Sequence, residues 1–202
     1  MKHTFTLALF LLLIACSSDS NPEDGLPKET QTGANTFGCL IDGKLLVPRS
    51  GNNNIVNPEW GAIIWGSGDA NPNAYKELEV RDLKSPRRAS FLLHMKEVAI
   101  HGIGDYIIDE SNGLNSTEGG GLNQNYIHCV IFDKTTNSYQ QYVSYENSGL
   151  LKITFYNPSA GVILSGTFNC KVRNIQNPND EIEITNGRFD VKPHNLMQTY
   201  FP

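Results

Sequence analysis

Short runs in which apolar and polar residues alternate constrain the fold more than any other feature of this sequence. From Asn35 onward these runs follow one another and are separated by Gly, Asn, Pro and Asp. Alternation with a period of two places apolar side chains on one face of a β-strand. No segment shows a pronounced helical periodicity. The sequence therefore predicts an antiparallel all-β domain of about ten short strands, arranged as a β-sandwich or a β-barrel. The pattern does not choose between these two architectures.

A hairpin is expected near each end of this region, with further strands between the two hairpins. These strands are expected near residues 61–66, 76–83, 89–98, 103–109, 126–133, 141–147, 150–156 and 163–174. The longest connection, residues 110–125, is polar and contains consecutive glycines from Gly119 to Gly121. The glycines lack the spacing and the following helix of a phosphate-binding loop. We therefore expect a flexible loop here.

The first hairpin is predicted from the segment TFGCLIDGKLLV, residues 36–47. Asp42 and Gly43 form a favoured two-residue turn, because both positions tolerate a positive φ. The turn places Leu40 opposite Leu45 and Cys39 opposite Leu46. Both faces of this hairpin are apolar, so we expect it to lie centrally in the sheet and to be covered on two sides.

The second hairpin is predicted from the segment EIEITNGRFDVK, residues 181–192. Asn186 and Gly187 form the two-residue turn, which fixes the register of the flanking strands. The expected pairs are Thr185 with Arg188, Ile184 with Phe189, Ile182 with Val191, and Glu181 with Lys192. This register places the apolar side chains on one face and leaves the other face to solvent.

The first residues of the chain, MKHTFTLALFLLLIAC, have the organisation of a signal peptide. Lys2 and His3 precede an apolar stretch that is shorter than the roughly 20 residues needed to span a bilayer. The sequence Leu13-Ile14-Ala15-Cys16 resembles the lipobox of bacterial lipoproteins. This resemblance implies removal of residues 1–15 and acylation, for example with palmitate, at Cys16. Two or more acyl chains are enough for stable anchoring in a membrane.

The composition of the residues after Cys16 predicts where the domain begins. Residues 16–34 are polar and without periodicity, so we expect a flexible tether followed by a single domain, residues 35–202. The acidic positions after Cys16 are Asp19, Glu23 and Asp24. They partly match the surface-export signal of Bacteroidota lipoproteins. We expect a lipid-anchored protein of the bacterial envelope, in the outer membrane, on its periplasmic or its extracellular face.

Charge and cysteine content exclude some classes of function. The formal net charge is −5, and the densest basic cluster is Lys84 with Arg87 and Arg88, so nucleic acid is not an expected partner. Cys39, Cys129 and Cys170 are too far apart in sequence for a CxxC zinc motif. Two alternatives stay open for them. All three are buried thiols, or Cys129 and Cys170 form a disulfide bond.

No arrangement of residues points to a particular reaction. His94, His101, His128 and His194 lack the spacing of a metal motif, so no metal or cofactor is expected. His128 and Cys129 are adjacent, so on a strand they point to opposite faces and do not form a nucleophile–base pair. There is no GxSxG motif. The carboxylates available for glycoside hydrolysis have no placement from sequence, and they are Asp82, Asp105, Asp109 and Glu110. We assign no catalytic residue.

Two segments together resemble a family of uncharacterised Bacteroidota lipoproteins. They are TQTGANTFGCLIDGKLLVP near the start of the domain and SGTFNCKVRN with EIEITNGRFDVK near its end. The resemblance brackets residues 30–193 and implies an all-β envelope lipoprotein. The family has no established activity, so it assigns no site residue.

We expect a non-catalytic module that binds a glycan, a small molecule or a protein partner. The alternatives are an assembly subunit of an outer-membrane complex and a hydrolase with an unrecognised site. Tyr139 and Tyr145 are expected on one strand face and Tyr142 on the other, where aromatic rings serve a core or an interface.

Overall fold

A single curled antiparallel sheet forms the protein. The computed structural model describes residues 21–52, 54, 56, 58–66, 74–96, 98–116, 119–159 and 162–202. The strands are β1 (Thr36–Ile41), β2 (Lys44–Leu46), β3 (Ala62–Gly66), β4 (Tyr75–Asp82), β5 (Ala89–Lys96), β6 (Gly104–Ile108), β7 (Tyr126–Asp133), β8 (Ser138–Val143), β9 (Gly149–Asn157), β10 (Ile163–Asn174) and β11 (Glu181–Val191). The helices are short and comprise the 3-10 turn η1 (Pro22–Gly25), α1 (Val98–His101) and α2 (Pro193–Leu196). The all-β prediction is confirmed.

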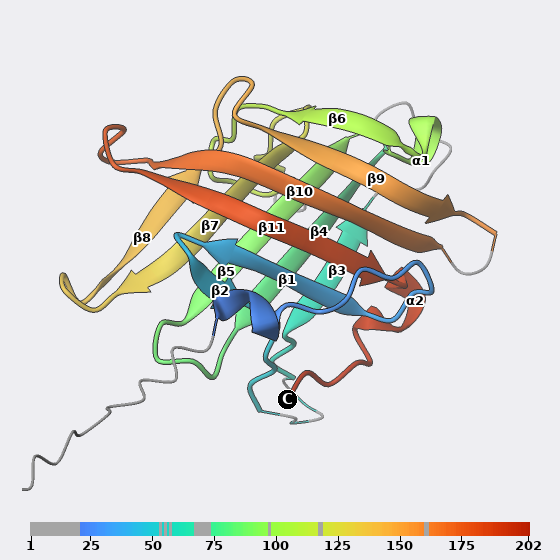
Figure 1. Ribbon diagram of the computed structural model, residues 1–202, viewed down its shortest axis with the longest axis horizontal. Coiled ribbons are helices and arrows are strands. Elements are labelled where there is room, and N and C mark those ends of the chain that lie inside the picture. Colours follow the sequence, from blue (N-terminus) through green and yellow to red (C-terminus); the bar gives the residue numbers. More distant parts are fainter. Residues whose placement is uncertain are drawn as a thin grey trace, which may run out of the picture.

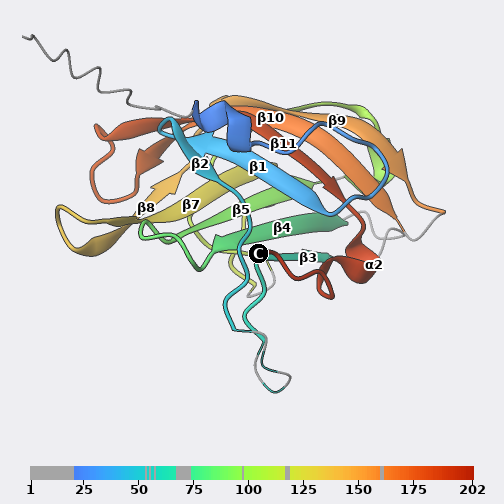
Figure 2. The same ribbon diagram turned by 60° about the horizontal axis from the view of Figure 1, so that its bottom comes forward.

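The sheet forks at β10, and this fork makes it a half-barrel. The strand order is β2-β1-β11-β10-β8-β7-β5-β4-β3, while β9 pairs with β10 and with β6. Along one edge β10 pairs with β9 over most of its length, and only Arg173 and Asn174 pair with β8. The sheet therefore folds into two layers, with β1, β9, β10 and β11 above β3, β4, β5 and β7 (Figures 1 and 2). β8 pairs with β10 only through Tyr142 and Val143, so the rest of β8 leaves the upper layer, and we call this end of the half-barrel its mouth.

Aromatic rings fill the space between the two layers. Phe37 from the upper layer lies 5.1 Å, centroid to centroid, from Phe91 in the lower layer. Phe168 is 5.3 Å from Phe91 and 5.8 Å from Phe37. Burial of such rings, each covering well over 100 Å² of apolar surface, is the main term that stabilises the fold. Among the described residues no helix is long and apolar enough to cross a membrane.

The first predicted hairpin has the predicted register but not the predicted place. Asp42 and Gly43 have φ values of 50° and 68°, and Cys39 and Leu40 pair with Leu46 and Leu45. The hairpin is covered on two sides, because Leu45 lies beside Gly25 of η1 while Cys39 faces the core. It is not central, however. β2 ends the strand order, and η1 covers its outer face (Figure 1).

The second predicted hairpin is wrong. Residues 181–191 form one continuous strand, β11, and the pairs predicted across Asn186 and Gly187 do not occur. Asn186 has a φ of 53°, but Gly187 does not have a positive φ, so these residues form a bulge instead of a two-residue turn. β11 pairs with β1 and β10 on its two sides, and the ladder shifts register here on both. Pairing on both edges outweighed the local turn preference.

Residues 21–34 were expected to belong to a flexible tether, whereas the structure places them against the domain. Asp190 accepts hydrogen bonds from the backbone N–H groups of Thr32, Gly33 and Ala34 at 3.0, 2.8 and 3.1 Å. Nearby, Asn35 accepts a 2.8 Å hydrogen bond from the backbone N–H of Lys192. Leu26 and Pro27 also pack against Gly38 of β1, so both polar and apolar contacts hold this segment against the domain. The expected signal peptide, Cys16 and the rest of the tether lie outside the described residues.

Candidate functional site

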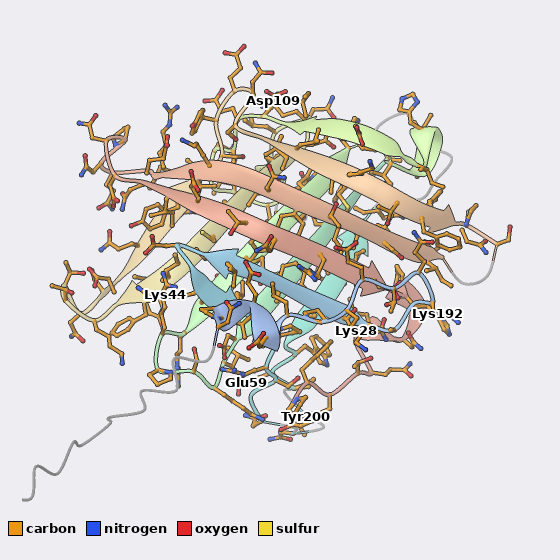
Figure 3. The ribbon with its side chains drawn as sticks, viewed as in Figure 1. Lys28, Lys44, Glu59, Asp109, Lys192 and Tyr200 are labelled. Atoms are coloured by element: carbon orange, nitrogen blue, oxygen red, sulfur yellow. The ribbon has the colours of Figure 1, made fainter. Side chains whose placement is uncertain are left out.

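A cleft of about 430 Å³ opens at the mouth of the half-barrel. Three connections surround it. They are the β1–β2 turn at Asp42, the β4–β5 connection at Arg87 and the β7–β8 turn from Asp133 to Thr135. Lys44 projects from the β1–β2 turn at this end of the molecule (Figure 3). The volume lies within the range of pockets that hold small ligands, and barrel mouths are a common place for them.

Apolar side chains from both layers line the floor of the mouth cleft. Ile131 of β7 and Tyr142 of β8 are 5% and 9% exposed, and Ile182 of β11 packs against the same core. The Tyr142 hydroxyl donates a 2.9 Å hydrogen bond to the Asp180 carboxylate. Burial and this bond raise the pKa of Tyr142 to about 12, so the phenol stays neutral. Gln140, opposite Ile131 on β8, also lines the cleft, and its amide is bonded to Ser138 and Asn174. The floor is therefore uncharged, and its polar groups already have partners within the protein.

The rim of the mouth cleft is charged, and its acids already have partners. Asp42 lies 3.8 Å from the Lys44 ammonium group. Asp133 accepts hydrogen bonds from the Thr135 backbone N–H and the Thr136 hydroxyl, each at 2.8 Å, and these bonds hold its pKa below the usual range. Neither acid is in the desolvated setting that a general acid of a glycosidase needs.

Arg87 differs from the rim acids. Its Nη1 donates a 3.1 Å hydrogen bond across the mouth to the Ile41 carbonyl oxygen. Among the residues that the structure describes, no carboxylate forms an ion pair with it. A guanidinium group has five N–H donors, so most of its donors remain available to a ligand. The cleft thus combines an apolar floor with a cation that lacks an anionic partner.

A second polar group of side chains lies on the outer face of the lower layer, beneath the connection from β6 to β7. Neighbouring positions on β4, β5 and β7 carry Glu77, His94 and Tyr126. Glu77 Oε1 accepts hydrogen bonds from His94 Nδ1 at 2.9 Å, from the Ser116 N–H at 2.7 Å and from the Tyr126 hydroxyl at 3.0 Å. Burial alone would raise the pKa of Glu77, but these bonds outweigh it and lower the pKa. We call this group the outer-face network.

Four stacked rings accompany the outer-face network. Tyr75, His94, Tyr126 and His128 follow one another at centroid distances of 5.1, 4.5 and 6.0 Å. His128 Nδ1 lies 3.2 Å from the Ser111 hydroxyl. Burial lowers the pKa of His128 to about 4, so it is a neutral ring at neutral pH. Residues 110–125 were expected to form a flexible loop, whereas Ser111 and Ser116 contact the sheet. The sequence does not indicate these contacts, because they depend on strand pairing.

The outer-face network is not a catalytic triad, although it contains Ser116, His94 and Glu77. In a triad the serine and the acid contact opposite nitrogens of the histidine. Here Ser116 Oγ lies 3.4 Å from the same Nδ1 atom that contacts Glu77. Glu77, His94 and Tyr126 are at most 2% exposed, so a substrate does not reach them. The network connects the loop to the sheet.

The three cysteines of the domain are free and buried. Cys39, Cys129 and Cys170 face the core, and the disulfide bond considered between Cys129 and Cys170 is not formed. Burial raises the pKa of Cys129 to about 12, although Arg87 partly offsets this shift. A thiol with such a pKa is a poor nucleophile. His128 points away from Cys129, to the outer face.

The remaining sequence candidates are dispersed. Asp82 pairs with Arg49 at 3.1 Å, and Asp109 accepts a hydrogen bond from the Asn147 backbone. Asp105, Glu110, His101 and His194 are exposed side chains outside both polar groups. Within the described part of the chain, no group of three or more His, Cys, Asp or Glu residues is arranged to hold a metal ion. Of the four histidines, His94 and His128 lie in the same stack of rings, on either side of Tyr126, and they do not form part of a metal-binding group among the described residues.

Comparison with known proteins gives no relative: no family model matches the chain, and neither a curated protein nor a solved structure does.

Proposed function

We propose that this protein is a lipoprotein of the bacterial envelope, anchored through Cys16, whose domain binds a small ligand in the mouth cleft. The observation that carries the binding role is the combination of an apolar floor with a polar rim between three turns. Membership of the Bacteroidota lipoprotein family and location in the outer membrane belong to the same proposal. They rest on the sequence of residues 11–20 and on the two motif segments.

The two motif segments have a common structural role, which supports treating them as one signature. Thr30 and the following residues of the first segment bind Asp190 of the second. Asp190 Oδ1 also accepts a 2.7 Å hydrogen bond from the Ser165 hydroxyl of β10. The entry of the chain into the domain is thereby fixed to its last strand.

Acylation at Cys16 places the domain close to the membrane. Only residues 16–20 lie between the lipid and the described part of the chain. Five residues span at most about 17 Å when fully extended. Asn21, which directly precedes η1, is therefore held within about that distance of the membrane surface, a shorter reach than a tether of residues 16–34 gives.

Mass spectrometry of the mature protein isolated from membranes tests the anchor. We expect a chain that begins at Cys16 and carries at least two acyl chains. Cys16→Ala removes both features, and Ser18→Ala, a matched control in the same segment, retains them. A mature chain that begins elsewhere, or one without acyl chains, contradicts the proposal. Native mass spectrometry of the same preparation tests the binding role, for which we expect one retained small molecule per chain.

A further inference from the structure

We propose that the occupant of the mouth cleft is an anionic amphiphile, a molecule with a carboxylate, sulfate or phosphate group on an apolar body. This inference rests on the proposed binding role and specifies the class of ligand. The anion is held by Arg87, and the apolar body lies on the floor formed by Ile131, Tyr142 and Ile182.

The charge of the rim supports an anion. The lining includes the cations Lys44, Arg87 and Lys134 and the acids Asp42 and Asp133. Both acids are engaged within the protein, as described above. Lys44 is shared with Asp42, whereas Arg87 and Lys134 form no ion pair among the described residues. Asp133 keeps its negative charge, because its partners are neutral, so the three cations of the lining outnumber the two acids and leave a positive balance on a chain whose formal net charge is −5.

The position of Arg87 makes it the principal anion contact. Lys134 is exposed at the tip of the β7–β8 turn, where solvent screens its charge. Arg87 is partly buried, and its bond to the Ile41 carbonyl fixes the guanidinium over the opening between β1 and the β4–β5 connection. A planar guanidinium binds an oxyanion through two parallel N–H donors. Fixing it beforehand reduces the entropy lost on binding.

The apolar floor of the cleft favours a ligand that has an apolar body in addition to its anionic group. Ile182 and Phe132 are half-buried and present apolar surface to the cleft, Ile131 beneath them is nearly buried, and the Tyr142 hydroxyl is occupied by Asp180. A small inorganic anion would leave this surface in contact with water, whereas an alkyl or aryl body covers it at roughly 25 cal/mol per Å². A sugar needs several free polar partners on the floor, whereas the Gln140 amide and the Tyr142 hydroxyl there are already hydrogen-bonded to other side chains of the protein.

An anionic amphiphile reaches the cleft from one of two sources, a phospholipid of the adjacent bilayer or a soluble organic acid. Both share the chemistry that the cleft recognises. The short reach of residues 16–20 keeps the domain beside the bilayer, so the experiment has an arm for each source.

Native mass spectrometry of the full lipidated protein in decyl maltoside tests the inference, because this detergent supplies a neutral decyl chain in excess. Decyl phosphate is the probe in the first arm. In the second arm the protein is reconstituted in phosphatidylcholine vesicles with one fifth phosphatidylglycerol and extracted again. We expect one retained decyl phosphate per chain. Retained phosphatidylglycerol without phosphatidylcholine identifies the bilayer as the source, and its absence identifies a soluble acid.

Arg87→Gln is expected to weaken binding of decyl phosphate at least tenfold, which corresponds to loss of a charge-assisted hydrogen bond. Arg88→Gln is the matched control, because Arg88 is the adjacent exposed cation and does not line the cleft, and we expect unchanged binding. Arg87→Lys keeps the charge and retains part of the affinity. Equal binding to the native and Arg87→Gln proteins overturns the inference, and so does native protein that retains no decyl phosphate. If the native protein retains a neutral molecule, the inference of an anionic ligand is overturned and the binding role stands. If the cleft is empty with both probes and in protein from the native membrane, the binding role is overturned as well.

Discussion

Two buried carboxylates, Asp190 and Glu77, differ in how their oxygens are used. Both side chains belong to residues that are 1% exposed, and both hold a polar segment of the chain against the sheet. Asp190 Oδ1 accepts from Gly33 and Ser165, and Oδ2 accepts from Thr30, Thr32 and Ala34. Each carboxylate oxygen therefore accepts at least two hydrogen bonds, and these donors stabilise the negative charge in place of water.

Glu77 has an uneven set of contacts. Its Oε1 atom accepts all three hydrogen bonds described above, whereas Oε2 is buried and has no hydrogen-bond partner among the residues that the structure describes. A buried acceptor without a partner costs about 1–3 kcal/mol. The outer-face network is thus less stabilising than the contacts of Asp190, although both follow from the same residue chemistry. The comparison shows that burial of a carboxylate does not by itself measure what it contributes.

The largest expected effect is that of Asp190→Asn. The amide nitrogen replaces one oxygen and meets at least two donors, whichever way the group is turned. We expect a loss of about 4 kcal/mol in the free energy of unfolding, since breaking a buried charged network costs about 3–5 kcal/mol. Urea denaturation at pH 7 measures it. A loss below about 1 kcal/mol would show that residues 30–34 do not depend on Asp190.

The pH dependence of the free energy of unfolding is expected to distinguish the outer-face rings from the contacts of Asp190. Burial lowers the pKa of His128 from 6.5 to about 4, so the unfolded chain binds a proton in this interval and the folded protein does not. The stability contributed by neutral His128 is present above pH 6.5 and is lost as the pH falls toward 4, by about 3 kcal/mol. Urea midpoints measured from pH 7 to pH 4 are expected to fall. In His128→Gln most of this decline is absent, and an unchanged slope would contradict the assignment.

Asp190 affects stability at a lower pH than His128 does, so its contribution is an internal control for the His128→Gln measurement. Its pKa is about 2, against 3.8 in the unfolded chain, because hydrogen bonds outweigh the effect of burial. A carboxylate with a lowered pKa stabilises the fold above its unfolded pKa, and this contribution is lost as the pH falls from about 4 to about 2. His128→Gln is expected to retain that acidic decline.

The strands were predictable from sequence because alternation reports directly which face of a strand is buried. The segments near 126–133 and 163–174 match β7 and β10 at both ends. The Asp42-Gly43 turn was also predictable, since both of its residues need a positive φ and no other strand competes for the turn itself. Local chemistry decides these features.

The other features depend on contacts between distant residues. Gly187 lies beneath the Phe168 ring, where a Cβ atom would lie within 2.5 Å of ring carbons, so glycine is required by packing and not by a turn. The same applies to the candidate site. Arg87 and Tyr142 come from separate connections and strands, and no spacing in the sequence indicates that they line one cleft. The proposed attachment residue Cys16 differs in that its motif is local, so it stays a prediction made from sequence alone.

Glu77→Gln has the smallest expected effect and completes the comparison with Asp190→Asn. The glutamine oxygen keeps the bonds from His94, Ser116 and Tyr126, and its amide nitrogen takes the place of Oε2, which meets no donor in the described part of the chain. Weaker bonds to a neutral acceptor are offset by removal of a buried charge. We expect a change within about 1 kcal/mol in urea denaturation at pH 7, whereas Glu77→Ala, which leaves three donors unpaired, is expected to cost about 3 kcal/mol. If Glu77→Gln is as damaging as Asp190→Asn, then Oε2 has a partner in solution, and the two carboxylates are equivalent after all.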